Sequence, residues 1–196
     1  TWFTDRTENT LLIGVDYQDL ETNGLELDNF AFSTIDIFDP TYGNFTPVSP
    51  ADLTRRNITK EQTGLYLQNQ LRLDDRWIFL AGARYDQAEV VDRNLTADSR
   101  QRADDDQISL SGGVMYLADN GFSPYLSWTE SFQPIAGVDN NGNLYEPRVG
   151  EQLEFGVKYA PNSLDLYVTA AIYNIEEENS LVTSPSGFQV QEGVRE

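Results

Sequence analysis

The sequence predicts an all-β protein, specifically an antiparallel segment of a transmembrane β-barrel with about eight strands. Two observations predict this fold: several segments alternate between apolar and polar residues with a period of two, and short turns alternate with long connections along the chain. A third observation indicates whether the apolar faces contact lipid or the interior of a soluble protein. Aromatic residues lie near both ends of the clearest hairpin, at about the spacing that a tilted strand needs to cross a bilayer. We therefore interpret the apolar faces as lipid-facing.

The clearest hairpin is predicted over residues 112–134, with a turn at 119–121. The turn contains Asp, Asn and Gly, which tolerate the positive φ angles of short hairpins. Tyr116 and Phe122 flank the turn, and Trp128 lies further along the second strand. Amphipathic rings favour the headgroup level of a membrane, so this placement predicts aromatic girdles at both ends of an apolar band.

The remaining strands follow from the same alternation. They are predicted at 9–19, 63–73, 77–86, 152–159 and 164–174, with a last strand from Phe188. The strand at 63–73 shows the pattern well, because its leucines alternate with polar or amphipathic residues. One face carries Leu65, Leu67, Leu71 and Leu73, and the other carries Tyr66, Gln68, Gln70 and Arg72. A lipid-facing outer side and a polar inner side fit this segment.

The connections alternate in length. Short turns are predicted at Asp74, Asp119 and Pro161, long loops at 20–57, 87–106 and 133–150, and a short polar connection at 176–187. Outer-membrane barrels have short periplasmic turns and longer extracellular loops. This asymmetry predicts that all the long loops lie outside the cell.

Composition excludes several functions. There are 13 Lys and Arg against 32 Asp and Glu, and the formal net charge of -19 disfavours nucleic-acid binding. The absence of His and Cys excludes disulfides, thiolate metal sites and Ser-His or Cys-His catalysis, so we do not expect an enzyme. The acidic run 104–106 is interpreted as a solvated loop tip rather than a calcium site, and 139–143 as a turn. The carboxylates at 176–178 are weak evidence for glycoside hydrolysis.

Several segments resemble one family. They are QTGLYLQNQ, LAGARYD, GGVMYLADNGFSPYLSWTESFQP, GEQLEFGVKYAP and AAIYNIEEENSLVTSP followed by GFQVQEGVRE. Together they resemble the barrel of TonB-dependent siderophore receptors, most closely the ferrichrome or ferric hydroxamate receptor group. In that family about 22 strands surround a plugged lumen. Because the chain starts at Thr1 and ends within an expected strand, residues 1–196 are expected to be an internal part of such a barrel, without the plug domain.

The resemblance implies import of an iron-siderophore complex across the bacterial outer membrane, energised through TonB. No cofactor bound by the chain itself is expected, because iron(III) arrives as a siderophore chelate. The implied partners are the ferric siderophore, outer-membrane lipid and lipopolysaccharide, and the TonB-ExbB-ExbD complex, which would act through the plug region.

The resemblance also suggests ligand contacts. Phe132, in the segment SFQP, matches a position that lines the ligand pocket in the ferrichrome group. The alternative is that Phe132 belongs to the outer aromatic girdle with Trp128. Phe38 and Tyr42 fall in the loop that carries further pocket aromatics in the family, although packing within the loop is the alternative for each. Rings and hydrogen-bond donors suit a chelate whose iron is already wrapped in its own oxygens.

Inward-facing charged residues are expected to line a solvated wall or to contact the plug; they are Arg72, Arg84, Glu154, Lys158 and Asp165. Two other functions stay open at this stage. A passive porin-like or structural barrel would conduct without an energy source. A soluble carbohydrate-binding β-sandwich would bury the face of Leu65 and Leu67 under a second sheet.

Overall fold

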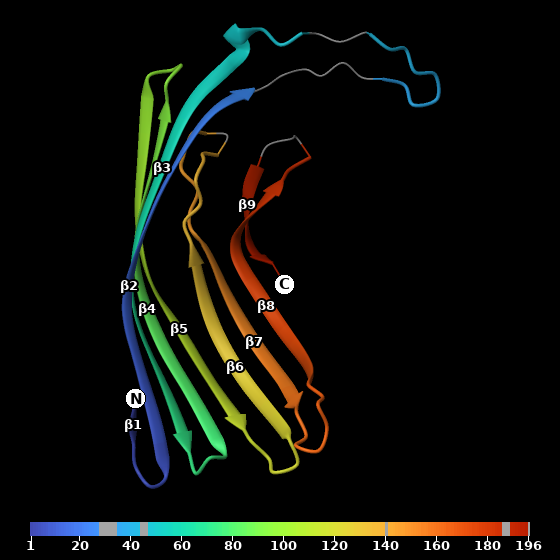
Figure 1. The fold of residues 1–196 in the computed structure, drawn as a ribbon. Helices are drawn as coiled ribbons and strands as arrows, with labels where there is room; N and C mark the ends of the chain where they lie inside the picture. The colour runs from blue at the N-terminus through green and yellow to red at the C-terminus, as the bar shows by residue number, and fades with distance from the viewer. Residues whose placement is uncertain (28–34, 44–46, 140, 186–188, 196) are drawn as a thin grey trace.

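In the computed structural model, the described residues 1–27, 35–43, 47–139, 141–185 and 189–195 form one antiparallel sheet (Figure 1). Its nine strands lie side by side in chain order, which confirms the predicted all-β class. They are β1 (Trp2–Phe3), β2 (Thr7–Leu27), β3 (Leu53–Leu73), β4 (Trp77–Asn94), β5 (Ser99–Tyr116), β6 (Phe122–Gln133), β7 (Arg148–Tyr159), β8 (Val168–Thr183) and β9 (Gln189–Arg195). A short 3-10 helix, η1 (Pro50–Asp52), precedes β3. Among the described residues, no helix is long and apolar enough to span a membrane.

The strand register confirms the two predicted faces. Leu65 of β3 lies opposite Val15 of β2 and Tyr85 of β4, and the alternate position, Gly64, lies opposite Asp16 and Asp86. Directly opposed residues share a face, so apolar rows continue from strand to strand on one side of the sheet. We call this side the apolar belt; it comprises Ile13, Val15, Leu65, Leu67, Ala83, Tyr85, Ile108, Leu110, Leu126, Phe155 and Ile172.

The apolar belt is open. Leu65 is 56% exposed and Leu67 is 47% exposed, and the described residues contain no second sheet that covers them. The soluble β-sandwich alternative required a second sheet over this face, and the described residues form only the one sheet.

Three predicted connections differ from the structure. The loop predicted at 87–106 is wrong, because β4 continues to Asn94 and β5 begins at Ser99. The loop at 20–57 is shorter than predicted, since β2 continues to Leu27 and β3 begins at Leu53. The connection at 176–187 is shorter as well, because β8 reaches Thr183, and β8 starts at Val168 rather than at 164. These extensions lie beyond the apolar belt, where neither face needs to be apolar, so alternation does not mark them.

The short turns at Asp74 and Asp119 lie where the sequence predicts them, whereas the connection at Pro161 runs over residues 160–167 because β8 starts only at Val168. Asp74 and Asp75 join β3 to β4 with φ angles of 52° and 56°, the left-handed values of a tight hairpin turn. Between β5 and β6, Gly121 has φ 87° and lies so close to Ala160 that a Cβ atom there would be 2.5 Å from its carbonyl oxygen. Only glycine fits this turn without strain.

The sheet curves (Figure 1), and a hydrogen bond across the curve shows that its polar face is the concave one. Lys60, on the polar face of β3, donates from Nζ to the carbonyl of Pro134 at 3.2 Å, although β4 and β5 lie between β3 and β6, the strand that Pro134 follows. Tyr145, in the β6–β7 loop, is buried and donates to the carbonyl of Gln189 at the start of β9. The β6–β7 loop at 134–147, which we call the inner loop, therefore lies inside the curve. The small apolar core consists of Ala88, Val90 and Val91 of β4 and Tyr145 of this loop.

Candidate functional site on the concave face

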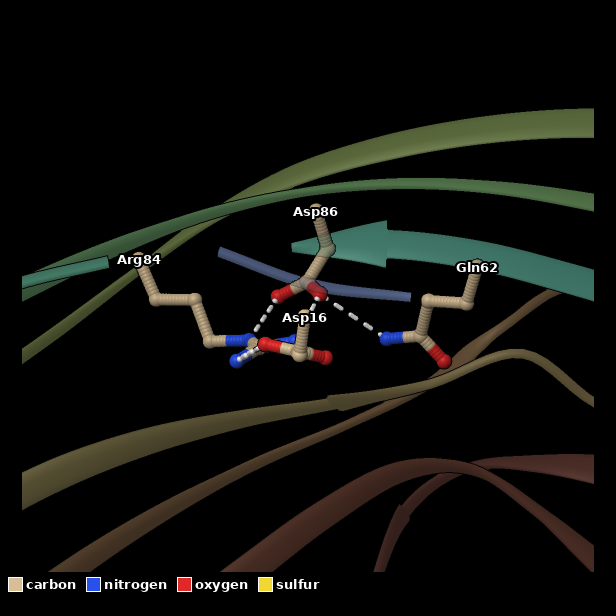
Figure 2. Close-up of polar contacts among 4 residues, drawn as sticks. All are labelled: Asp16, Gln62, Arg84 and Asp86. Carbon is tan, nitrogen blue, oxygen red and sulfur yellow. Dashed lines mark hydrogen bonds and ion pairs between the residues drawn. The ribbon is translucent and has the colours of Figure 1, made fainter. Parts of the chain in front are cut away.

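An ion-pair cluster occupies the concave face of β2, β3 and β4. We call it the Arg84 cluster; it contains Asp16, Gln62, Arg84 and Asp86 (Figure 2). The guanidinium of Arg84 lies between the two carboxylates, with Nη1 2.6 Å from Asp16 Oδ1 and Nη2 2.6 Å from Asp86 Oδ1. Gln62 donates to Asp86 Oδ1 at 2.9 Å. Asp86 is only 2% exposed, so these bonds satisfy a carboxylate that water does not reach.

Glycine makes the cluster possible. Gly64 lies between Asp16 and Asp86 in the register of β2, β3 and β4. A Cβ atom at Gly64 would overlap the guanidinium of Arg84 and lie 2.9 Å from Asp16 Oδ1. Arg84 can therefore cross β3 only because position 64 has no side chain.

A second buried ion pair lies beyond the apolar belt. Arg56 of β3 binds Asp92 of β4, with Nη1 3.2 Å from Oδ2, and Glu26 of β2 lies 3.2 Å from its Nε. Asp92 is 4% exposed. Burial raises the pKa of Asp92, and the positive charge of Arg56 offsets this only in part. The inner loop lies near this ion pair. Burial raises the pKa of Tyr145 in the loop, and the positive charge of Arg56 offsets part of this rise.

The inner loop is held at both ends. Glu146 exchanges two hydrogen bonds with the Gln191 side chain, through its backbone N–H at 2.9 Å and its carbonyl at 2.7 Å. Within the loop, Asp139 accepts the N–H groups of Asn141 and Asn143, each at 2.8 Å. These bonds stabilise the carboxylate and lower the pKa of Asp139. This geometry matches the predicted turn at 139–143.

The structure does not bring the three predicted ligand contacts together. Residues 35–43 lie at the far end of the β2–β3 connection, away from the sheet (Figure 1), and there Phe38 is 92% exposed and Tyr42 is 82% exposed. Phe132 is half-buried on β6, opposite Val149 of β7. By register it shares the face of Trp128, which is the arrangement expected of the aromatic girdle. Its role in ligand binding stays a prediction.

Sequence reasoning placed Arg84 correctly on the polar face but did not find its partners. Asp16 lies 68 residues away in the chain, so only the strand register reveals the pair. Tyr145 was missed as well, since it lies in a loop rich in Gly and Asn; a large ring between such residues was the available signal. Within the described ranges, no three His, Cys, Asp or Glu residues gather closely enough to hold a metal ion.

Comparison with known proteins identifies relatives of this chain. Residues 1–193 match the family model "TonB dependent receptor-like, beta-barrel". The chain is 40% identical over 179 residues to the ferrioxamine B receptor of Salmonella typhimurium. The matched stretch covers 90% of this chain and 25% of that protein. It is 36% identical over 194 residues to the ferrichrome outer membrane transporter/phage receptor of Escherichia coli, covering 95% of this chain and 26% of that protein. The chain thus spans about a quarter of the length of these curated relatives.

Solved structures show the same fold. The ferric-catecholate import receptor Fiu of E. coli superposes with a TM-score of 0.69 at 16% identity, over 98% of this chain and 32% of that one. The alcaligin outer membrane receptor FauA of Bordetella pertussis superposes with a TM-score of 0.56 at 17% identity, over 94% of this chain and 34% of that one. At these identities the likeness concerns the fold of the strands alone.

Proposed function

The chain belongs to the TonB-dependent receptor β-barrel family, and from this premise we propose that it forms part of a receptor that imports ferric hydroxamate siderophores. Proteins of this family are outer-membrane transporters and not enzymes, so the apolar belt faces lipid. The concave face then lines the lumen of a closed barrel, and further strands of the same protein pair with the two edges of the sheet, formed by β1 and β2 on one side and by β9 on the other.

The observation that carries the proposal is the separation of the two faces across the whole sheet. Apolar rows run along one side, and the opposite side holds ion pairs such as Arg84 with Asp16, together with an inner loop. A barrel that moves a polar solute needs this arrangement, because its outside contacts lipid and its inside contacts water or protein. The names of two relatives, receptors for ferrioxamine B and ferrichrome, support hydroxamate chelates as the substrate class.

The proposal includes partners. Transport against a gradient requires energy, which we assign to TonB with ExbB and ExbD, acting through the lumen-filling plug domain of the whole receptor. Lipid and lipopolysaccharide would contact the apolar belt. Iron(III) is cargo here, enclosed in its chelate, so no metal ligands are needed from this chain.

For ligand capture we propose Phe38 and Tyr42 on the extracellular loop. Their exposed rings are free to pack on the apolar and amide exterior of a chelate. Phe132 is a weaker candidate, because its register with Val149 favours the aromatic girdle.

Binding of ferrichrome and ferrioxamine B to the intact receptor in detergent tests the proposal. Saturable quenching of intrinsic Trp and Tyr fluorescence is expected. The double variant Phe38→Ala/Tyr42→Ala should weaken binding by about thirtyfold, since each aromatic contact contributes on the order of 1 kcal/mol. Ile37→Ala is the matched control, because Ile37 is 80% exposed in the same loop and has no ring. A folded receptor that gives no response to any ferric hydroxamate would refute the proposed function.

A further inference from the structure

The backbone ladder between β5 and β6 is shorter than the ladders on either side of it. It joins five residue pairs and ends toward the long loops at Ser111–Thr129. The adjacent ladders join 18 pairs between β4 and β5 and 12 pairs between β6 and β7. Residues 99–110 of β5 therefore pair with β4 alone, and Figure 1 shows this part of β5 rising away from β6. We call the boundary between 99–110 of β5 and 130–133 of β6 the seam.

Side chains replace the backbone ladder where the seam begins. Glu130 Oε2 accepts the N–H of Leu110 at 2.8 Å, and Gln107 donates from Nε2 to the carbonyl of Ile108 at 3.1 Å. Residues two apart in a strand direct their backbone groups to the same edge, so both bonds serve the edge of β5 that faces β6. Capping of this kind protects an edge from pairing with another strand. The interruption is thus a feature of the fold and not a vacancy for a further strand.

A cavity of about 170 Å³ lies in the seam. Its lining includes Gln107 of β5 and Glu130 and Ser131 of β6. Gln107 lies on the polar face and Glu130 on the face of Trp128, so the cavity lies between the two strands and not on one side of the sheet. Paired strands are only about 4.8 Å apart and leave no such space. The two strands are therefore already separated here.

The inner loop lies across the seam but is bonded mainly to one side of it. Its residues Tyr145 and Glu146 form hydrogen bonds with β9, whereas Lys60 of β3 reaches the loop with the single bond to the carbonyl of Pro134. Burial and the charges of Asp104 and Glu146 raise the pKa of Asp105 on β5. The like charges of Asp105 and Glu146 repel each other across the seam.

We propose that the seam is a hinge at which β2–β5 and β6–β9 part, so that the wall opens between them toward the long loops. The five ladder pairs and the short turn at 117–121 hold the two parts together at the other end. Glu130 and Lys60 act as latches, and the inner loop moves with β6–β9. The opening widens the mouth of the lumen during import. This last step rests on the proposed function, whereas the hinge itself requires only a closed barrel.

Distances between spin labels in the intact receptor in detergent test the hinge. This chain contains no Cys, so any Cys elsewhere in the receptor is first replaced by Ser. Arg100→Cys with Glu178→Cys spans the seam, and Asn23→Cys with Arg100→Cys is the matched pair within β2–β5; two strands lie between the labelled strands in each case. The first pair should show two distance populations and the matched pair one. One population for both pairs, or two for both, would overturn the hinge.

The latches are tested one at a time. Glu130→Leu and Lys60→Met should each raise the ratio of the longer to the shorter distance by about tenfold, the effect of one lost hydrogen bond to a charged group. Glu130→Gln is the matched control, because its amide oxygen still accepts the N–H of Leu110 and the ratio should change less than about twofold. Amide exchange of residues 103–111 gives a second measurement, and it should be about tenfold faster in Glu130→Leu than in Glu130→Gln. Equal ratios and equal exchange in all variants would overturn the latches.

A covalent lock tests whether import needs the opening. Leu110→Cys with Glu130→Cys places a disulfide just beyond the end of the β5–β6 ladder, where it should slow cellular uptake of an iron-labelled trihydroxamate by at least about tenfold until a reductant is added. Leu67→Cys with Ala83→Cys is the matched control, because these residues already oppose each other in the β3–β4 ladder. Uptake at the wild-type rate with the lock formed would overturn the role of the hinge in import. If wild type imports no ferric hydroxamate, the proposed function has failed, while the label distances still decide the hinge.

Discussion

Arg84 of β4 reaches across β3 to Asp16 of β2, with its Nη1 2.6 Å from Asp16 Oδ1. The pair joins strands that do not touch, and it passes over the bare backbone of Gly64. Neighbouring strands are already joined by backbone hydrogen bonds, whereas this pair adds a bond between second neighbours. It therefore fixes the curvature of the wall as well as its register.

We expect Arg84→Met to destabilise the receptor by roughly 2–4 kcal/mol, because it leaves Asp86 buried without a cation. Gly64→Ala should cost about 1–3 kcal/mol, since Arg84 must give up Asp16. Chemical unfolding of the intact receptor in detergent measures both. The control Gly24→Ala, with open space around its position, should change stability by less than about 0.5 kcal/mol. A Gly64→Ala variant as stable as this control would contradict the role given to Arg84.

Asp92 predicts a pH dependence. Burial raises its folded pKa above the unfolded value of about 3.9, so the folded state holds the proton more tightly. The resulting penalty is absent below the unfolded pKa, grows as the pH rises through the folded pKa, and is constant above it. Asp92→Asn removes this penalty, so its stability relative to wild type should increase as the pH rises from about 4 to about 7.

Unfolding midpoints of wild type and Asp92→Asn across this pH range provide the measurement. Asp104 is the opposite case, because its hydrogen bond from Arg102 lowers its pKa. Asp104→Asn should therefore lose stability relative to wild type above the unfolded pKa, and that loss should vanish as the pH falls through the folded pKa. If both variants changed in the same direction with pH, the assignment of burial as the cause at Asp92 would be wrong.

Tyr145 is predicted to hold the inner loop in place. Its ring is 8% exposed, and its hydroxyl donates to the carbonyl of Gln189 at 3.3 Å. Tyr145→Ala should free the loop, so that amide protons of residues 135–146 exchange at least about tenfold faster, for a loss of about 1.4 kcal/mol or more. Hydrogen exchange with mass spectrometry measures this. Tyr42→Ala serves as the control, since Tyr42 is exposed, and unchanged exchange in Tyr145→Ala would show that other contacts hold the loop.

The sequence predicted the strands that cross the membrane because lipid on one face and polar surroundings on the other impose a period of two. It did not predict the continuation of β4 from Gln87 to Asn94, where Ala88, Val90 and Val91 are buried. The backbone ladder to β5 and this burial maintain the strand, while charged residues such as Glu89 and Arg93 interrupt the alternation. Alternation disappears although the strand does not.

Site prediction was limited for a different reason. The polar character of Arg84 was visible from alternation, but its binding of Asp16 depends on a register that joins positions 68 residues apart. A single sequence contains no direct signal for such combinations, whereas the family resemblance rested on whole strands and was confirmed.

Phe132 gives the last prediction, because its two proposed roles require opposite faces. The ladder from Leu126–Phe155 through Trp128–Leu153 to Phe132–Val149 runs without a bulge, so Phe132 lies on the same side as Trp128. The register of β6 against β7 would have to shift by one residue to turn the ring of Phe132 toward the lumen. We therefore expect Phe132 to face lipid.

Fluorescence quenching decides between the two faces. In a receptor in which Phe replaces Trp2, Trp77, Trp128 and every Trp outside this chain, the variant Phe132→Trp should be quenched by brominated lipids as strongly as a receptor that keeps Trp128 alone, because both indoles would lie at the same membrane interface. A ferric chelate bound in the lumen should quench it no more than it quenches Trp128. Strong quenching by the chelate with little effect of brominated lipid would place residue 132 in the ligand pocket and refute the register argument, since a ring in a regular strand cannot reach both faces.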